Sequence, residues 1–372
     1  MFKKISLKIE QRVSLRVQRI FFGSTFVSAA KIAVTFLILY LLANAAEGSM
    51  TAYGNYQNII TILMAVVGLS VQNGVTNYTA KSDIDGTKSS LTPHLLSIFM
   101  IGLAALSVIT AIAYVWDLDF VSNLIGFSEG NFRFSLLIFI SILGVLQSYY
   151  CAALIGKGLV VQGQVFDLLR NLLFVIFIAA YICWHKDLNL IGFFVVSHLI
   201  IVPFLLRQVT LNPSLEFKPK FDAATIRIIK PGMVTMYSGI MVASVSILVR
   251  NTAVDYGGYV LSDLFEILIR IKVMYHLVVS APLSLILLRS YAVADASKTF
   301  HLAYKALPIV VVPMLCVALT PESVLQSLLL LAFNKELGDL KFVLLLLLGA
   351  ESVRVIALFF HNFLVSKAIV IP

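Results

Sequence analysis

Charged side chains are scarce in this sequence of 372 residues. Asp, Glu, Lys and Arg together make up only 13% of it, whereas 60% of the residues are hydrophobic. Ordinary soluble proteins have about 25% charged and about 45–50% apolar residues. So few charges cannot cover the surface of a soluble globule of this size, which excludes a water-soluble protein. The mean hydropathy of +0.96 is instead typical of a protein that crosses a membrane several times.

The motifs of several enzyme classes are also absent. No GxxxxGK[ST] phosphate loop occurs, which excludes a Walker-type ATP site within the chain. The three cysteines, Cys151, Cys183 and Cys316, are far apart, and the six histidines are scattered without metal-ligand spacing. We therefore expect no disulfide framework, no metal site, no cofactor and no enzymatic activity.

Long apolar runs fill most of the chain and predict an all-α protein. A spanning helix needs about 20 mostly apolar residues, whereas strands of membrane barrels are about 10 residues long and alternate in polarity. Ten runs of helical length are present: Phe21–Leu42, Asn58–Val75, Leu95–Trp116, Phe134–Leu154, Val165–Trp184, Leu190–Leu206, Met233–Val249, Val260–Leu288, Leu302–Thr320 and Phe342–Val365. The sequence thus predicts a polytopic helical membrane protein with about ten transmembrane helices.

The basic residues are distributed unevenly between the two sides of these predicted spans. Of the 28 Lys and Arg residues, 18 fall in the N-terminal tail and the loops on its side, and only five, including Arg250, fall on the other. Basic residues concentrate in cytoplasmic loops. We therefore predict that both termini are cytoplasmic, and we attribute the net charge of +9 to membrane orientation rather than to nucleic-acid binding.

Two interpretations of the N-terminal region remain. The basic tail 1–19 forms either a short amphipathic helix on the inner leaflet or a disordered segment. The first apolar run also resembles a secretory signal peptide, since Ala43-Asn44-Ala45 imitates a cleavage site. We favour a permanent span, because this run is some 22 residues long and contains Lys31, whereas a signal has an uncharged core of about 7–15 residues.

Charged residues inside the predicted spans are the candidates for function, because each costs about 2.5–3.5 kcal/mol at the centre of a membrane helix. The basic ones are Lys31, Arg170, Arg270, Lys272 and Arg354. Two acids stand three residues before a base, in the pairs Asp167/Arg170 and Glu351/Arg354, and Glu266 lies in the eighth span. Such pairs form on one helix face and are either structural or part of an anion site. Lys31 either extends its ammonium to the interface or faces a hydrated cavity.

Four stretches resemble a known family, the Wzx-type lipid-linked oligosaccharide flippases of the multidrug/oligosaccharidyl-lipid/polysaccharide exporter superfamily. Lys31 lies in a stretch similar to the family's first helix. The most specific stretch is Gln72–Tyr78, whose Asn73, Gly74, Thr76 and Tyr78 resemble the motif that ends the second helix. Ala153–Gly158 is similar to the loop between the fourth and fifth helices, and Gly349–Val355 is similar to the tenth helix with its acid and base. At Asn77 the family commonly has a base.

The resemblance implies a bundle of two lobes around a central cavity, as in multidrug exporters of this superfamily. On this basis the chain divides into the tail 1–19, a six-helix lobe 20–206, a basic cytoplasmic loop 207–231 and a second lobe 232–372. The family has twelve helices, so the second lobe is two helices short. We expect either a truncated, inactive chain or a lineage that closes this lobe differently, and we favour the truncation.

The resemblance also implies a function. Such a protein moves undecaprenyl-pyrophosphate-linked oligosaccharide, an O-antigen or enterobacterial common antigen repeat unit, across the bacterial inner membrane by alternating access. The five basic residues within spans would pair with the pyrophosphate, and Asp167, Glu266 and Glu351 would serve as ion-coupling groups or charge partners. A glycan polymerase and a chain-length regulator are the implied protein partners.

Two other functions remain open. A cation-coupled multidrug exporter of the same fold would need acids without basic partners in its cavity. A membrane-embedded glycan polymerase or transferase is less well supported, because it typically needs a large outward loop with catalytic residues, and the outward loops predicted here are all short.

Overall fold

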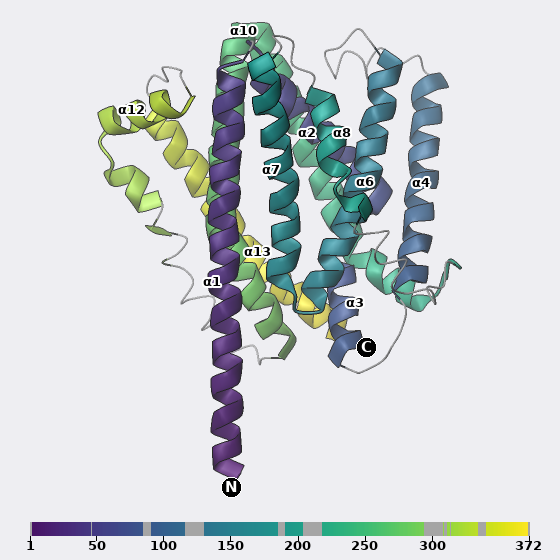
Figure 1. Ribbon diagram of the computed structural model, residues 1–372. Coiled ribbons are helices and arrows are strands. Elements are labelled where there is room, and N and C mark those ends of the chain that lie inside the picture. The colour runs from purple at the N-terminus through teal and green to yellow at the C-terminus, as the bar shows by residue number, and fades with distance from the viewer. Residues whose placement is uncertain are drawn as a thin grey trace. The chain divides into compact units, whose positions relative to one another are not determined.

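The computed structural model of the chain is helical throughout the part that it describes (Figure 1). The backbone is described at residues 2–45, 47–84, 91–115, 130–184, 190–203, 218–293, 308, 311–312, 314–333 and 340–370. Side chains are described at residues 23–45, 47–82, 91–111, 135–180, 192–203, 218–276, 308, 311–312, 314–327, 330 and 341–357. None of the residues with a described backbone forms a strand, which confirms the all-α class.

The helices have the following bounds: α1 Phe2–Ala43, α2 Ser49–Gly68, α3 Gln72–Ile84, α4 Thr92–Val115, α6 Gly130–Gly156, α7 Val160–Trp184, α8 Leu190–His198, α10 Ala223–Val293, α12 Glu322–Phe333 and α13 Leu340–Val370. Among the described residues, five helical segments are long and apolar enough to cross a membrane, or six if α2 and α3 form one bent span. This agrees with a helical membrane protein. The ten predicted spans are not confirmed, and part of the ninth lies outside the described residues.

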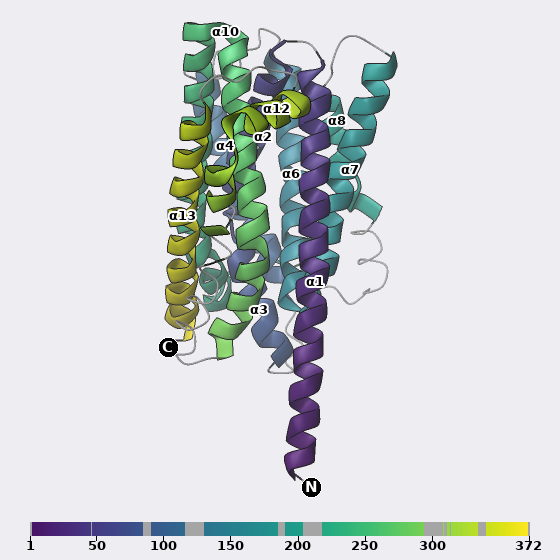
Figure 2. The ribbon, with the colours of Figure 1, turned by 90° about the vertical axis from the view of Figure 1, so that its left-hand side faces the viewer.

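The chain forms two compact units. One comprises Met1–Asn44 and Ile267–Pro372, so it contains α1, the last part of α10, α12 and α13. The other comprises Ala45–Glu266 and contains α2 to α8 together with the first part of α10. Figure 2 shows α1 as a single uninterrupted helix, so the basic tail continues directly into the first apolar run.

The second predicted span is broken rather than continuous. Helix α2 ends at Gly68, and Leu69 and Ser70 both have a φ of 47°, in the left-handed region that non-glycine residues rarely adopt. Helix α3 then starts at Gln72, bent by 48° from α2. The Tyr149 hydroxyl donates to the Gly68 carbonyl at 3.1 Å, which satisfies one of the carbonyl groups that the helix end leaves free.

Glycines set the closest contacts within the second unit. A Cβ built at Gly102 of α4 would overlap the carbonyl of Val67 in α2, and one at Gly74 of α3 would overlap the carbonyl of Ile228 in α10. Because neither position has a side chain, the backbones approach each other directly. Small residues allow membrane helices to pack in this way.

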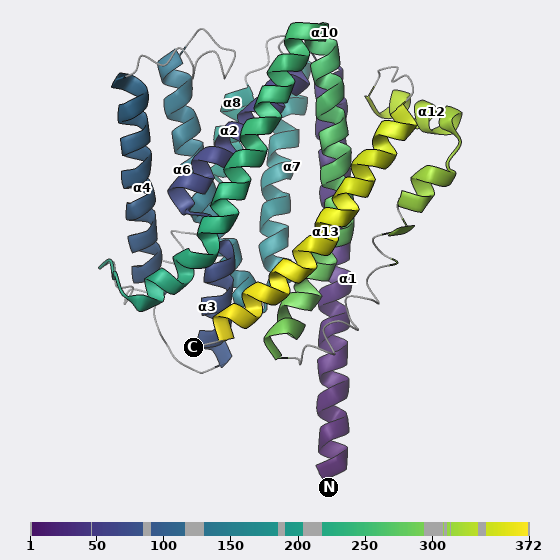
Figure 3. The same ribbon diagram turned by 180° about the vertical axis from the view of Figure 1, so that it is seen from behind.

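Helix α10 turns back on itself at Gly258, as Figure 3 shows. This residue has φ 67° and ψ −170°, a conformation that is essentially restricted to glycine. The turn separates a first leg, 223–257, from a second leg, 259–293, and these legs contain the seventh and eighth predicted spans. The division between the two units falls in the second leg, between Glu266 and Ile267.

Candidate functional site

A carboxylate surrounded by bases lies in the first unit, between α13 and the second leg of α10. The side chain of Glu351 is only 1% exposed, and three basic side chains contact it. His276 Nδ1 lies 2.9 Å from its Oε1, while Lys272 Nζ and Arg354 Nη1 each lie 3.5 Å from its Oε2. We call Lys272, His276, Glu351 and Arg354 the basic cluster.

Helical spacing explains how the basic cluster forms. Lys272 and His276 are four residues apart on α10, and Glu351 and Arg354 are three apart on α13, so each pair shares one helix face. A buried hydrogen bond of 2.6 Å between the hydroxyls of Tyr275 and Ser352 joins the same two helices. The two faces are therefore held against each other by polar contacts.

The chemistry of the basic cluster favours an anion. One buried carboxylate cannot neutralise two permanent cations, and His276 adds a third positive charge when it is protonated. The exposed area belongs to the bases: 30% of the Lys272 side chain, 34% of His276 and 51% of Arg354. Lys272 and Arg354 thus have N–H donors beyond those that face Glu351, and a phosphate group could accept from them.

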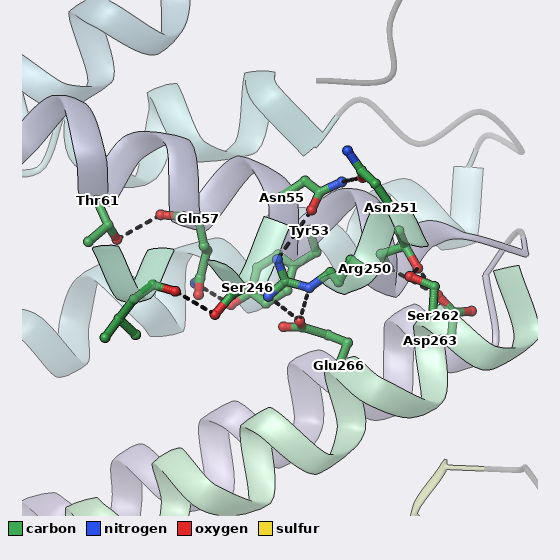
Figure 4. Close-up of polar contacts among 12 residues, drawn as sticks. Tyr53, Asn55, Gln57, Thr61, Ser246, Arg250, Asn251, Ser262, Asp263 and Glu266 are labelled. Atoms are coloured by element: carbon green, nitrogen blue, oxygen red, sulfur yellow. Dashed lines mark hydrogen bonds and ion pairs between the residues drawn. The ribbon is translucent and has the colours of Figure 1, made fainter. Parts of the chain in front are cut away.

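A second polar cluster lies in the second unit, between α2 and the turn of α10 (Figure 4). Arg250 and Glu266 form an ion pair in which both side chains are almost fully buried, at 1% and 0% exposure. Arg250 donates from Nε and Nη2 to Glu266 Oε2, each at 2.6 Å. Arg250 lies on the first leg of α10 and Glu266 on the second leg, on either side of Gly258.

Helix α2 supplies the remaining acceptors of Arg250. Asn55 Oδ1 accepts from Nη1 at 3.2 Å. The amide of Asn58, oriented with its oxygen toward the guanidinium, accepts from Nη1 at 2.7 Å and Nη2 at 3.2 Å. Since every nitrogen of Arg250 has an acceptor, the charge is compensated within the protein.

The second polar cluster extends one further turn along α2. Asp263 Oδ1 accepts from the backbone N–H of Thr51 at 3.0 Å and from its hydroxyl at 2.8 Å. The hydroxyls of Thr51 and Ser262 also lie 2.9 Å apart. We call Thr51, Asn55, Asn58, Arg250, Ser262, Asp263 and Glu266 the α2–α10 network.

The other predicted charge pair forms as expected from its spacing. In α7, Arg170 Nη2 lies 3.0 Å from Asp167 Oδ1, and Arg170 also donates to the Asn171 side chain. Both charged side chains are partly exposed. The pair belongs to the second unit, whereas the basic cluster belongs to the first.

Two predicted basic residues lie outside these clusters. Lys31 is half-buried in α1, and its carbonyl accepts a hydrogen bond from the Thr35 hydroxyl. Arg270 is 8% exposed in the second leg of α10. Both belong to the first unit.

Three of the four motif residues in α3, Gly74, Thr76 and Tyr78, pack against neighbouring helices, and the fourth is Asn73. Gly74 allows the close approach of Ile228, and Thr76 donates to the Ala152 carbonyl of α6 at 3.2 Å. The ring of Tyr78 packs edge-on against His94 with centroids 5.4 Å apart, and Asn73 is exposed. The motif thus positions α3 against its neighbours.

Sequence analysis missed several residues of both clusters. His276 stands one turn after Lys272, and this spacing was the available signal. Arg250 was assigned to an outward loop because the seventh run was ended at Val249, whereas the helix continues to the turn at Gly258. Asn55 and Asn58 are neutral and gave no signal. No group of three or more His, Cys, Asp or Glu able to hold a metal occurs among the residues whose side chains are described.

Comparisons with known proteins give a fold but no family. The sequence matches no protein-family model and no curated protein. A solved structure called "protein A" is similar over 95% of this chain and 94% of that chain, with a TM-score of 0.56 and 11% sequence identity. At this identity the likeness supports the fold alone.

Proposed function

We propose that this chain is a flippase that carries a lipid-linked anionic oligosaccharide across the bacterial inner membrane. The observation that supports the proposal is the basic cluster. It gathers three bases around one buried carboxylate in helices that are expected to lie in the bilayer. The resemblance of the sequence to Wzx-type flippases supplies the substrate class, an undecaprenyl-pyrophosphate oligosaccharide.

The charge balance of the basic cluster is the physical argument. A positive charge left over within a membrane helix costs about 2.5–3.5 kcal/mol. That cost is offset if an anionic cargo supplies the missing negative charge. Pyrophosphate is suitable, because its oxygens accept hydrogen bonds from both a guanidinium and an ammonium group. In the proposal, Glu351 holds the three bases in place and they bind the cargo.

Movement of the cargo follows from the cost of its polar parts in hydrocarbon. Pyrophosphate and sugars cannot cross the bilayer unaided, since unpaired charge is prohibitive there. Alternating access lets them pass through a hydrated path while the lipid tail stays in the bilayer. The resemblance makes Lys31 and Arg170 further candidates to pair with the pyrophosphate.

The charge partners in the structure weigh against a cation-coupled drug exporter. Such a protein would need acids that are free to bind a cation. Each of the three acids that sequence analysis singled out has a basic side chain close by: Arg170 beside Asp167, Arg250 beside Glu266, and three bases around Glu351. These acids are therefore better suited to holding bases than to binding an ion.

Transport by purified protein in liposomes tests the proposal. Undecaprenyl-pyrophosphate carrying a labelled oligosaccharide is placed in the membrane, and its arrival at the outer leaflet is measured by the binding of an added lectin. We expect transport with the wild-type protein. The variants Lys272→Ala, Arg354→Ala and Lys31→Ala should each transport the lipid about tenfold more slowly or worse. Each loses one charged hydrogen bond to the cargo, and such a bond contributes about 1.5–3 kcal/mol.

The matched control is Lys157→Ala, which removes an exposed base in the turn between α6 and α7. This variant should transport at the wild-type rate. Wild-type transport by the Lys272→Ala and Arg354→Ala proteins, once they are shown to be folded, would contradict the role of the basic cluster. A drug exporter or a glycan transferase would leave the labelled lipid in its original leaflet.

A further inference from the structure

The α2–α10 network has no role in binding the cargo as proposed above, yet it is the most completely buried charged group described in the chain's second unit. Its three α2 residues, Thr51, Asn55 and Asn58, are spaced by four and three positions and so share one face of the helix. Each contacts α10 by a hydrogen bond. Two turns of α2 are therefore attached by polar groups to the hairpin that the two legs of α10 form.

The backbone is adapted to this contact. A Cβ built at Gly54 would collide with the carboxylate of Glu266 and with Nε of Arg250. Only a glycine at this position lets the ion pair lie directly against the α2 backbone. The buried pair and the helix surface thus fit each other, which distinguishes the network from a chance contact of polar side chains.

The network joins the two lobes that the sequence predicts. Helix α2 belongs to the predicted lobe 20–206, and the α10 residues of the network, 250 to 266, belong to the predicted lobe 232–372. The network lies near the first turns of α2, which begins at Ser49, and near the hairpin turn at Gly258. Positive-inside orientation assigns both of these ends to the periplasmic side.

Polar contacts suit an interface that must separate. A buried ion pair contributes little net stability compared with apolar packing, because water solvates each partner well once they part. An interface of hydrogen bonds can therefore open into a hydrated path at a lower cost than a tightly packed apolar one. The same contacts are specific in direction, so they re-form in one register.

We propose that the α2–α10 network is an outer gate, closed in this structure, whose separation opens the periplasmic exit. This inference rests on the proposed alternating-access function, since a gate needs a path to close. Arg250 is the central gating residue, because its guanidinium contacts both α2 and the opposite leg of α10.

A reversible cross-link tests the gate. Thr51→Cys and Ser262→Cys are introduced into a chain in which Cys151, Cys183 and Cys316 are replaced by Ala. The hydroxyl oxygens of Thr51 and Ser262 lie 2.9 Å apart, so sulfurs in their place are within reach of a disulfide. Oxidation should stop transport of the labelled undecaprenyl-pyrophosphate oligosaccharide, and reduction should restore it. Undiminished transport by the fully cross-linked protein would overturn the gate.

The control cross-link lies within the first predicted lobe. Gly163→Cys is combined with the native Cys151, whose Sγ lies 3.5 Å from the Gly163 carbonyl, in a chain in which the other two cysteines are replaced. This bond joins α6 to α7 and should leave the transport rate unchanged on oxidation. If oxidation of the control pair stops transport as fully as oxidation of the gate pair, the effect comes from general rigidity of the protein. The assignment of the α2–α10 network as a gate would then be wrong.

A second readout does not depend on transport. Ser246 precedes Arg250 by four residues on the same leg of α10 and is half-buried, so Ser246→Cys reports access to the face behind the network. Labelling by a membrane-impermeant maleimide from the hairpin side should be slow. Adding Glu266→Gln should raise the labelling rate about tenfold, because a lost charged hydrogen bond shifts a two-state equilibrium by that factor.

Thr51→Val serves as a second opening variant, since it removes a hydroxyl without leaving a charge unpaired. Labelling of Ser246→Cys that is unchanged in both variants would overturn the gate. The two readouts also separate the proposals. If the labelling of Ser246→Cys rises in these variants but the protein does not transport the lipid, the gate is supported and the flippase proposal is wrong. If the protein transports the lipid and the cross-link does not block this, the flippase is supported and the gate is wrong.

Discussion

A guanidinium group buried in a membrane helix needs a full set of acceptors. Arg250 has one in the structure, with Glu266 taking the charge and two asparagines of α2 taking the remaining N–H groups. Removing one partner leaves the other charge buried without compensation, whereas replacing both by apolar residues of similar size removes the problem.

We therefore expect opposite effects from single and double substitution of this pair. Arg250→Ala should destabilise the protein by about 3–5 kcal/mol, because it leaves Glu266 unpaired. The double variant Arg250→Met/Glu266→Leu should be close to the wild type in stability. Thermal unfolding in detergent, followed by circular dichroism, measures both. A double variant that is as unstable as Arg250→Ala would show that the charges themselves stabilise the fold.

Asp222 caps the start of α10, and its carboxyl group makes the stability of the protein depend on pH. Its Oδ1 accepts from the backbone N–H groups of Thr225 and Ala224, each at 3.0 Å. The Thr225 N–H in particular, together with His94, holds the pKa of this carboxyl below its ordinary value of 3.8. A carboxyl whose pKa falls on folding stabilises the protein above its unfolded pKa and loses this effect as the pH falls through its folded pKa.

Asp222→Ala should thus lower Tm at pH 7 on the order of a few degrees, and this difference should shrink as the pH falls below about 4. Asp222→Asn is the control, because asparagine keeps a side-chain cap and lacks the charge. Its Tm at pH 7 should lie between those of the wild type and Asp222→Ala, and its difference from Asp222→Ala should not change as the pH falls. A difference between wild type and Asp222→Ala that stays constant down to pH 3 would be inconsistent with a cap that depends on charge.

Some of these contacts were predictable from the sequence and others were not, for a physical reason. The Glu351/Arg354 and Asp167/Arg170 pairs were predictable because both partners lie on one helix turn. The contacts of Glu351 with Lys272 and His276 join residues about 75 positions apart, and only the packing of α13 against α10 creates them. The role of Arg250 likewise depends on α2, nearly 200 positions earlier.

At the scale of helices, some glycines lie directly against the backbone of a neighbouring helix and others have no neighbour within 4 Å of a built Cβ. Gly102→Ala should destabilise the protein by about 1–3 kcal/mol, because its Cβ would overlap the Val67 carbonyl and a backbone cannot move aside as a side chain can. Gly239 of α10 has nothing within 4 Å of a built Cβ. Gly239→Ala should raise stability by up to about 1 kcal/mol through helix propensity.

Unfolding of the two variants in detergent checks this contrast. Equal effects of Gly102→Ala and Gly239→Ala would mean that the contact between α2 and α4 is looser than the structure shows. Since both substitutions add the same methyl group to a helix, the comparison isolates the packing of the neighbouring backbone.

Helix existence was more predictable from sequence than helix continuity. The predicted spans Leu95–Trp116, Phe134–Leu154 and Val165–Trp184 match α4, α6 and α7 to within a few residues. The run Asn58–Val75 instead contains the break at Leu69 and Ser70. Leu69 and Ser70 are both compatible with a helix, and at the break the Tyr149 hydroxyl of α6 binds the Gly68 carbonyl.

At the scale of the whole molecule, the prediction is one of orientation. The turn around Lys157, between α6 and α7, should face the cytoplasm, and the exposed Asp255 beside the α10 turn should face the periplasm. Lys157→Cys and Asp255→Cys in intact cells report this through an impermeant thiol reagent, in a chain without its native cysteines. We expect rapid labelling of Asp255→Cys and none of Lys157→Cys until the cells are opened. The reverse pattern would invert the topology.

The general class was predictable at this scale because composition and run length determine it. The packing of the chain was not. The two compact units divide at Glu266 and Ile267, inside a continuous helix, whereas the lobes were drawn at the basic loop 207–231. A boundary within a helix leaves no signal in composition. The division into lobes thus stays a prediction.

The turn at Gly258 has a consequence for the biogenesis of the protein. Arg250 is synthesised 16 residues before Glu266, so the first leg of α10 reaches the insertion machinery before the counter-charge of its arginine exists. Because a single glycine joins the legs, the second leg follows at once and can supply it. We infer that the two legs partition into the bilayer as one hairpin, and that lengthening the turn at Gly258 would delay insertion even where it left the finished fold intact.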